Sequence, residues 1–221
     1  MSGLSQSTAP QATAAAPAST AAPASATPDQ NTLGNAAIAS QISGNSAAPD
    51  YNPEFWNTFD VKRSNNCYSY AVNDPDGGAY GVGSTPGAAA GKPAQPADGG
   101  PALIAACVAD GLILAAGDGT LAEHAPAPPA PPEGHYLVAL YLDPKEGEGD
   151  FTDYHWYRRD SNGKWSHKQG RQAVSNEDFA HNEIGNLSTA DTGKYLWCAY
   201  FFIPQQGIDT EFAFQPSPSA G

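Results

Sequence analysis

The four residues Asp160, Ser161, Asn162 and Gly163 separate two runs rich in aromatic side chains, residues 153–159 and 164–169. Aromatic residues favour strands and Asn-Gly favours a tight turn, so the stretch predicts a β-hairpin. Asp160 at the first turn position, Asn162 at the third and Gly163 at the next fit a type I turn followed by a left-handed glycine. This turn constrains the fold most, because it sets the register of both strands.

The register decides where two histidines lie. A two-residue or a four-residue turn would put His155 and His167 on opposite faces of the hairpin. The three-residue turn with its bulge instead pairs His155 with Gln169 and Tyr157 with His167. His155, Tyr157, Trp165 and His167 then share one face, and the two imidazoles come within reach of a hydrogen bond.

A cysteine lies at a predicted helix start. Ser64, Asn65 and Asn66 are all good N-cap residues, and we expect a short helix from about Cys67 to Asn73. A thiol in the first turn faces unpaired N–H groups and the positive end of the helix dipole, which favours the thiolate. Cys67 is therefore a candidate nucleophile. The same amides can stabilise an oxyanion, and a histidine from a sheet packed on the helix can act as base and acid.

This order of groups resembles the NlpC/P60 branch of the papain-like cysteine peptidases and its CHAP-like relatives. The resemblance implies Cys67 as nucleophile, His155 as general base and acid, and His167 as the residue that orients His155. It also implies cleavage of an amide bond through an acyl-enzyme, in a peptide or peptidoglycan-like substrate. The nucleophile segment reads Asn-Cys-Tyr-Ser, where the family usually has Asp-Cys-Ser-Gly.

The order of predicted elements indicates an α+β fold, and with the resemblance a papain-like one, in which N-terminal helices pack on an antiparallel β-sheet. After Cys67 a second helix begins near Pro101 and ends near Gly111, and strands follow from His135 to Pro204. We expect a thiol hydrolase domain over residues 51–215, with low-complexity insertions near 75–100 and 115–134. Residues 1–50 contain no aromatic residue and predict a disordered tail rich in Ala, Ser, Thr and Pro.

Four residues near the histidines and the cysteine are candidates for substrate binding: Asn66, Tyr68, Trp156 and Tyr157. Aromatic residues on strands usually pack first, so the alternative for them is core packing. Cys107 and Cys198 are predicted to be packed core thiols. Asp178, Asn182 and Asn66 could instead orient His155 or add an oxyanion donor. The alternative for Asp178 and Asn182 is ordinary turn chemistry. His124, His135 and His181 are predicted to lie at the surface, and since no HxxxH or CxxC spacing occurs, we expect neither a metal nor a cofactor.

A net charge of −13 argues against nucleic acid and against an anionic membrane surface as partners. No Lys or Arg precedes Lys62, which argues against a classical signal peptide. The sequence thus predicts a soluble protein, either cytoplasmic or exported without such a signal as an effector or phage-associated protein. In the latter case the tail would meet a secretion or phage-assembly partner. Two functions compete with hydrolysis: acyl transfer by the same site, and a catalytically inactive interaction module.

Overall fold

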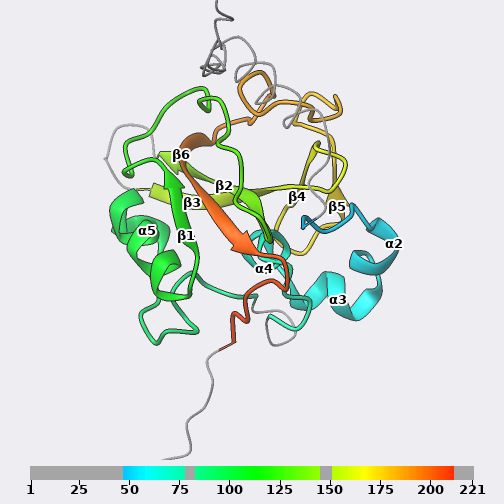
Figure 1. Ribbon diagram of the computed structural model, residues 1–221, viewed down its shortest axis with the longest axis horizontal. Coiled ribbons are helices and arrows are strands. Elements are labelled where there is room, and N and C mark those ends of the chain that lie inside the picture. Colours follow the sequence, from blue (N-terminus) through cyan, green and yellow to red (C-terminus); the bar gives the residue numbers. More distant parts are fainter. Residues whose placement is uncertain (1–46, 78–82, 145–150, 212–221) are drawn as a thin grey trace, which may run out of the picture.

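The computed structural model describes residues 47–77, 83–144 and 151–211. These residues form an α+β fold around a six-stranded sheet, as the order of predicted elements indicates. The order of strands is β1-β6-β2-β3-β4-β5, and every neighbouring pair is antiparallel (Figure 1). The strands are β1 (Ile113–Ala116), β2 (His135–Pro144), β3 (Phe151–Arg159), β4 (Trp165–Lys168), β5 (Val174–Ser175) and β6 (Leu196–Pro204).

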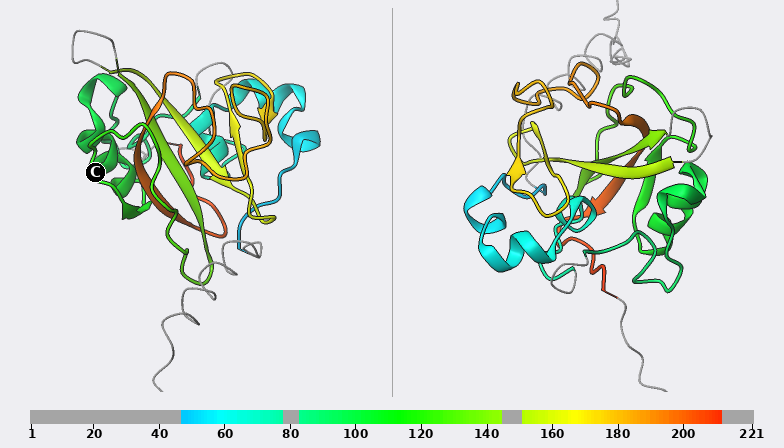
Figure 2. Two further views of the ribbon diagram at one scale, coloured as in Figure 1. Left: turned by 90° about the horizontal axis from the view of Figure 1, so that it is seen from above. Right: turned by 180° about the vertical axis from the view of Figure 1, so that it is seen from behind.

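The helices are short. They are α2 (Pro53–Trp56), α3 (Phe59–Ser64), α4 (Cys67–Ala71), the 3-10 turn η1 (Pro96–Asp98) and α5 (Gly100–Ala109). Figures 1 and 2 show α5 at the end of the sheet near β1. Helices α2 and α3 lie at the opposite end, near β5. None of the helices in the described ranges is long and apolar enough to cross a membrane.

Alternating side chains give the sheet two buried faces. Tyr136, Val138 and Trp156 belong to a cluster that α4 and α5 cover with Tyr68 and Leu103. The opposite face carries a second cluster, to which the loops after β1 and β5 contribute. Its members include Ala125, Leu137, Tyr157, Ile184 and Leu187. The helices therefore cover one face and loops cover the other.

The hairpin turn is the one that the sequence predicts. The pairs across β3 and β4 include Tyr157 with His167 and Arg159 with Trp165. Gly163 has φ 81° and donates its N–H to the carbonyl of Asp160 at 2.9 Å. The predicted register and the left-handed glycine are thus confirmed.

The long strands and the helices near Cys67 and Pro101 are confirmed, although α4 ends at Ala71 and not near Asn73. β1 and β5 were not predicted. Their sequences, Ile-Leu-Ala-Ala and Val-Ser, carry too few residues for a recognisable alternation, so pairing with β6 and β4 defines them.

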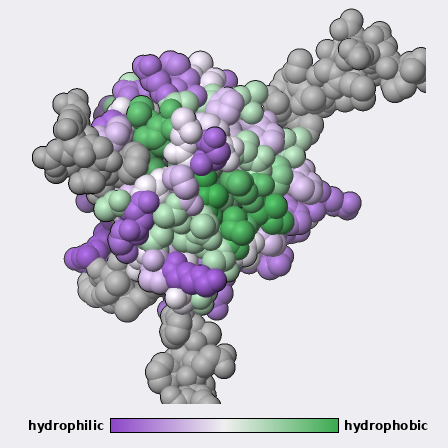
Figure 3. Space-filling model, turned by 90° about the vertical axis from the view of Figure 1, so that its left-hand side faces the viewer, coloured by the Kyte–Doolittle hydropathy of each residue, from purple (hydrophilic) through white to green (hydrophobic). Residues whose placement is uncertain are grey.

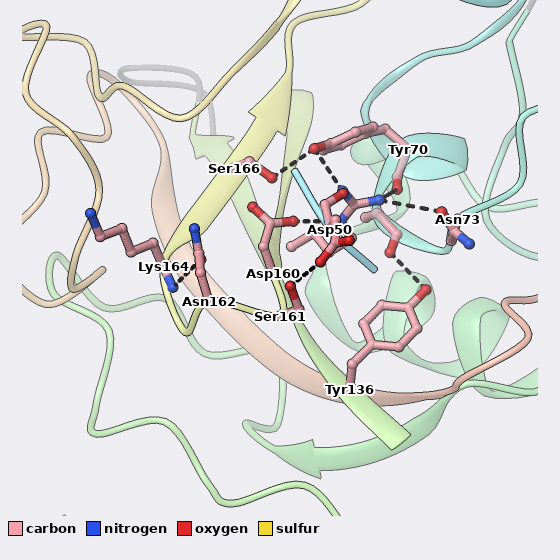
Figure 4. A network of polar contacts seen from close by, with 11 residues as sticks. Asp50, Tyr70, Asn73, Tyr136, Asp160, Ser161, Asn162, Lys164 and Ser166 are labelled. Atoms are coloured by element: carbon pink, nitrogen blue, oxygen red, sulfur yellow. Dashed lines mark hydrogen bonds and ion pairs between the residues drawn. The ribbon is translucent and has the colours of Figure 1, made fainter. Parts of the chain in front are cut away.

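A buried arginine holds α4 against the sheet. Arg158 on β3 is fully buried, and its Nε lies 2.9 Å from Asp160 Oδ1. Its other nitrogens donate to the hydroxyl of Tyr70 at 2.9 Å and to the backbone carbonyls of Tyr70 and Asp50 (Figure 4). The guanidinium also lies over the Tyr70 ring, 4.2 Å from its centroid. One side chain thus joins β3, α4, the hairpin turn and the residues before α2.

The packed region begins before the predicted boundary at residue 51. Ala47 and Ala48 are buried, and Ser161 donates its N–H to the carbonyl of Pro49 at 3.0 Å. Residues 47–50 therefore belong with the domain and not with the tail, because the hairpin turn and Arg158 provide partners for their backbone. The remainder of the predicted tail, residues 1–46, lies outside the described residues.

Candidate functional site

Asn66 starts the helix that carries Cys67. Its Oδ1 accepts the N–H groups of Tyr68 and Ser69 at 3.0 and 3.1 Å, and Ser69 Oγ accepts the N–H of Asn66 in return. Its Nδ2 donates to the carbonyl of Ser84 at 2.6 Å. Asn66 is thus the N-cap, one of three that the sequence allowed. Both ends of its amide are engaged in structure, so a role as oxyanion donor does not fit it.

The surroundings of Cys67 favour its neutral thiol. Burial and the carboxylate of Asp153 raise its pKa to about 12, and nearby backbone N–H groups offset this only in part. The expectation that the helix start favours the thiolate is therefore wrong for the resting protein. Desolvation of the thiol is the largest cause, and the field of the short helix α4, two of whose free N–H groups Asn66 already occupies, does not outweigh it.

The two histidines form a hydrogen-bonded relay. His155 Nε2 lies 2.6 Å from His167 Nδ1, and His167 Nε2 lies 2.8 Å from the carbonyl oxygen of Glu177. A carbonyl only accepts, so the Nε2 of His167 carries a hydrogen and its Nδ1 has a free lone pair. That lone pair accepts a hydrogen from Nε2 of His155. The Nδ1 of His155 is then an unprotonated base, and it has no partner among the described residues.

Both imidazoles are held neutral. Burial, and then the neighbouring His167, lowers the pKa of His155 well below its ordinary value. Burial also lowers the pKa of His167, against the carbonyl of Glu177 and the carboxylate of Asp178, which favour its charged form. His155 is therefore available as a base at neutral pH.

Cys67 and His155 line one cavity, of about 590 Å³. They come from opposite faces of the sheet: α4 packs with Trp156, whereas His155 packs with Tyr157. The cavity that both line lies where the paired part of β3 and β4 ends, since the register covers Tyr157 but not His155. The thiol contacts the edge of β3 there, 3.8 Å from the carbonyl oxygen of Tyr154. Within the described residues the thiol and His155 share no hydrogen bond.

Of the four predicted substrate-binding residues, Asn66 lines this cavity. Tyr68, Trp156 and Tyr157 are fully buried and lie elsewhere. Tyr68 donates its hydroxyl to Asp110 at 2.8 Å and packs on Trp156, while Tyr157 stacks on the His167 ring, with 5.0 Å between centroids. The predicted role in substrate binding does not fit these three positions, because their rings are packed in the core.

Sequence reasoning missed most of the cavity wall. Asp153, Phe179 and Tyr195 line it beside His155, and the Tyr195 hydroxyl donates to Asp153 Oδ2 at 2.7 Å. The ring centroids of Tyr195 and Phe179 lie 5.2 and 6.4 Å from that of His155. Asp153 could have been found two residues before His155 on the same strand. Phe179 and Tyr195 gave no signal, because they lie in loops far along the chain.

The remaining candidates have other surroundings. Cys107 and Cys198 are fully buried in the core, as predicted. Asp178 accepts three backbone N–H groups, from Ala180, Asn182 and Asp191, and so organises the loop that carries Phe179. His124 and His181 are exposed and His135 is partly exposed. Within 47–77, 83–144 and 151–211, no three His, Cys, Asp or Glu side chains are grouped to hold a metal ion.

Comparison with known proteins finds a relative of this chain. No model of a known protein family matches the chain, and no solved structure matches it. The chain is 37% identical over 145 residues to Insoluble matrix shell protein 1 of Ruditapes philippinarum. The match covers 66% of this chain and 82% of that protein. At this identity and coverage, the chain belongs to the same family as Insoluble matrix shell protein 1.

Proposed function

We propose that this chain is a cysteine-dependent amide hydrolase of the papain-like, NlpC/P60-related type, with Cys67 as nucleophile and His155 as base. The observation that carries the proposal is the relay from His155 through His167 to the carbonyl of Glu177. It leaves a lone pair on Nδ1 of His155, a residue that lines the same cavity as Cys67. The relay fixes the tautomer of the base without a carboxylate.

The chemistry starts from a neutral pair. Nδ1 of His155 takes the proton of Cys67 as Sγ attacks the substrate carbonyl, and the N–H of Cys67 is a donor for the oxyanion. Nδ1 returns this proton to the leaving amine, and a thioester remains on Sγ. Water then attacks the thioester and gives a proton to Nδ1, which passes to the departing thiolate. An amine or alcohol in place of water would make the same site an acyltransferase.

Selective alkylation tests this proposal without knowledge of the substrate. With iodoacetamide, we expect Cys67 to react at least about tenfold faster than Cys107 or Cys198, because Cys67 lines a cavity together with a base, whereas the other two thiols are fully buried in the core. His155→Ala should slow the reaction of Cys67 by a similar factor. His167→Ala should have a smaller effect, since it acts on the orientation of His155. Peptide mapping after brief labelling gives all three rates.

Two controls make this test specific. His181→Ala removes an exposed imidazole and should leave the rate at Cys67 unchanged. Cys67→Ala should abolish amine release from any peptide or peptidoglycan substrate that the chain cleaves. A Cys67 that reacts no faster than the two core thiols would reject the enzyme.

The relative's name favours a second function. Insoluble matrix shell protein 1 is, in its printed name, a matrix protein, so this chain could instead be a non-catalytic interaction module of a matrix. In that case Cys67→Ala would leave binding of the chain to the matrix unchanged. Sedimentation with an insoluble matrix fraction separates the two functions: a module co-sediments equally with and without the thiol, and shows no selective labelling of Cys67.

A further inference from the structure

Lys168, the last residue of β4, has an unusual environment. Its side chain is fully buried, and its ammonium donates to three backbone carbonyls, those of Lys62 at 2.8 Å and of Asn65 and Gly170 at 2.7 Å. An ammonium has three hydrogens, so all of its donors are used. Within the described residues it forms no ion pair with a carboxylate, and burial lowers its pKa to about 8.

The three carbonyls belong to segments that the site needs. Those of Lys62 and Asn65 lie at the end of α3, where helix carbonyls lack partners and a cation is favoured. Asn65 also directly precedes Asn66, the cap of α4. Gly170 lines the cavity beside Cys67. The ammonium therefore touches the start of the nucleophile helix and one wall of the cavity.

Lys168 also follows His167 directly, and the two side chains leave β4 on opposite faces. The imidazole joins the relay to His155, while the ammonium joins the segment before Cys67. One dipeptide thus contacts both halves of the site. This matters because the nucleophile and the base come from opposite faces and share no hydrogen bond that could set their distance.

We propose that Lys168 is a positioning residue, which sets Cys67 relative to the His155–His167 relay by binding the α3–α4 junction to the end of β4. This inference rests on the proposed function for its consequence in catalysis, and on the three hydrogen bonds for its geometry. Lys168 does not act on the substrate. Its charge favours the arrangement because three carbonyl dipoles point at it.

The test compares Lys168→Met with Lys164→Met. Both remove one lysine charge from the same hairpin, but Lys164 is exposed and pairs with Glu183. In Lys168→Met we expect the alkylation rate of Cys67 to fall at least fivefold, with Cys107 and Cys198 within twofold of the unmodified chain. The hydrogen shared by the two imidazoles, followed by proton NMR, should shift or broaden. Lys164→Met should change none of these.

The outcomes separate this inference from the proposed function. If Cys67 of the unmodified chain is alkylated no faster than Cys107 and Cys198, the enzyme is rejected. The NMR signal of the hydrogen shared by the two imidazoles then tests the positioning role of Lys168 by itself. A selective Cys67 whose rate is unchanged or faster in Lys168→Met rejects the positioning role. Equal acceleration of all three thiols also rejects it, because this shows general loosening.

A measurement on the unmodified chain covers the case in which Lys168→Met does not fold. The ammonium hydrogens of Lys168 should exchange with water far more slowly at pH 6 than those of Lys164, in NMR of the lysine Nζ nitrogens. Equally fast exchange at both lysines would show that the three hydrogen bonds do not persist, and the inference would fail.

Discussion

Helices α4 and α5 each carry a cysteine and cover the same face of the sheet, but different forces hold them. Directional contacts locate α4: the cap by Asn66, the guanidinium of Arg158 and the ammonium of Lys168 at the preceding segment. Neither helix contains a charged residue, but α5 begins without a side-chain cap and buries Leu103 and Cys107. The thiol on α4 lines a cavity, and the thiol on α5 lies in the core.

The outer surface at α5 is also apolar. Figure 3 shows hydrophobic residues gathered on the side of the molecule where α5 and β1 lie. Val108, Ile113 and Leu114 are between 41% and 48% exposed there. Burial of apolar surface holds a helix in place but tolerates small shifts in its position. Hydrogen bonds to a buried cation allow only a narrow range of donor–acceptor distances, so they set the position of the helix more closely. The candidate nucleophile therefore lies on the helix that directional contacts locate.

The largest effect should come from breaking the polar anchor. Arg158→Met leaves the carboxylate of Asp160 buried without its partner, and we expect a loss of about 3–5 kcal/mol in the free energy of unfolding. Urea denaturation measures this. Lys164→Met, which removes an exposed pair, should change it by less than about 0.5 kcal/mol. A loss below about 1 kcal/mol for Arg158→Met would mean that burial of apolar surface holds α4 in place, as it does α5.

Leu103→Ala tests the apolar helix. It should cost about 3 kcal/mol, because it removes a fully buried side chain and leaves a cavity. Val108→Ala on the exposed side of the same helix should cost less than about 1 kcal/mol. Neither variant should alter the alkylation rate of Cys67 in the folded protein. A change at Cys67 in Leu103→Ala would show that α5 also positions the site.

Asn66→Ala sharpens the comparison at the cap. We expect a loss of about 1 kcal/mol, because two N–H groups at the start of α4 lose their acceptor. The cap of α2 offers a matched control: Asn52 accepts one N–H at an exposed position, and Asn52→Ala should cost less. Equal losses from the two variants would argue that the buried capping box adds nothing.

The smallest effect near neutral pH concerns the relay. The pKa values of His155 and His167 are lowered in the folded chain, so below about pH 6.5 the unfolded state binds more protons than the folded state. The contribution of the two histidines to stability should therefore be constant from pH 8 to 7 and fall as the pH drops below about 6.5. Urea midpoints at pH 7.5 and 5.5 measure this. His181→Ala should retain the difference, and a rise in stability at pH 5.5 would contradict the neutral relay.

Much of the fold and half of the site could be predicted from local patterns. The turn at residues 160–163 can be predicted from its own residues, because Asn162 and Gly163 favour one backbone conformation. That conformation fixes which residues of the two strands pair. The relation of His155 to His167 follows from this register. Asn66 as a cap is also local. These predictions needed only residues within a few positions of one another.

The rest depended on contacts between distant residues. The strands β1 and β5 exist through their partners, and the cavity wall takes Phe179 and Tyr195 from a loop whose course no short pattern specifies. From the sequence, Tyr68 and Trp156 could have lined a groove or filled the core. In the structure their rings pack on each other in the core. In these cases one sequence allowed two arrangements of similar local energy.

The sequence by itself determined the hairpin, its register, the shared face of the two histidines and the helix start at Cys67, because backbone preferences of neighbouring residues suffice for each. The tertiary structure alone decided the charge state of the thiol. A helix start favours a thiolate by a local field, but burial beside Asp153 outweighs that field and keeps the thiol protonated. Desolvation depends on everything that surrounds a group, and no short stretch of sequence contains that information.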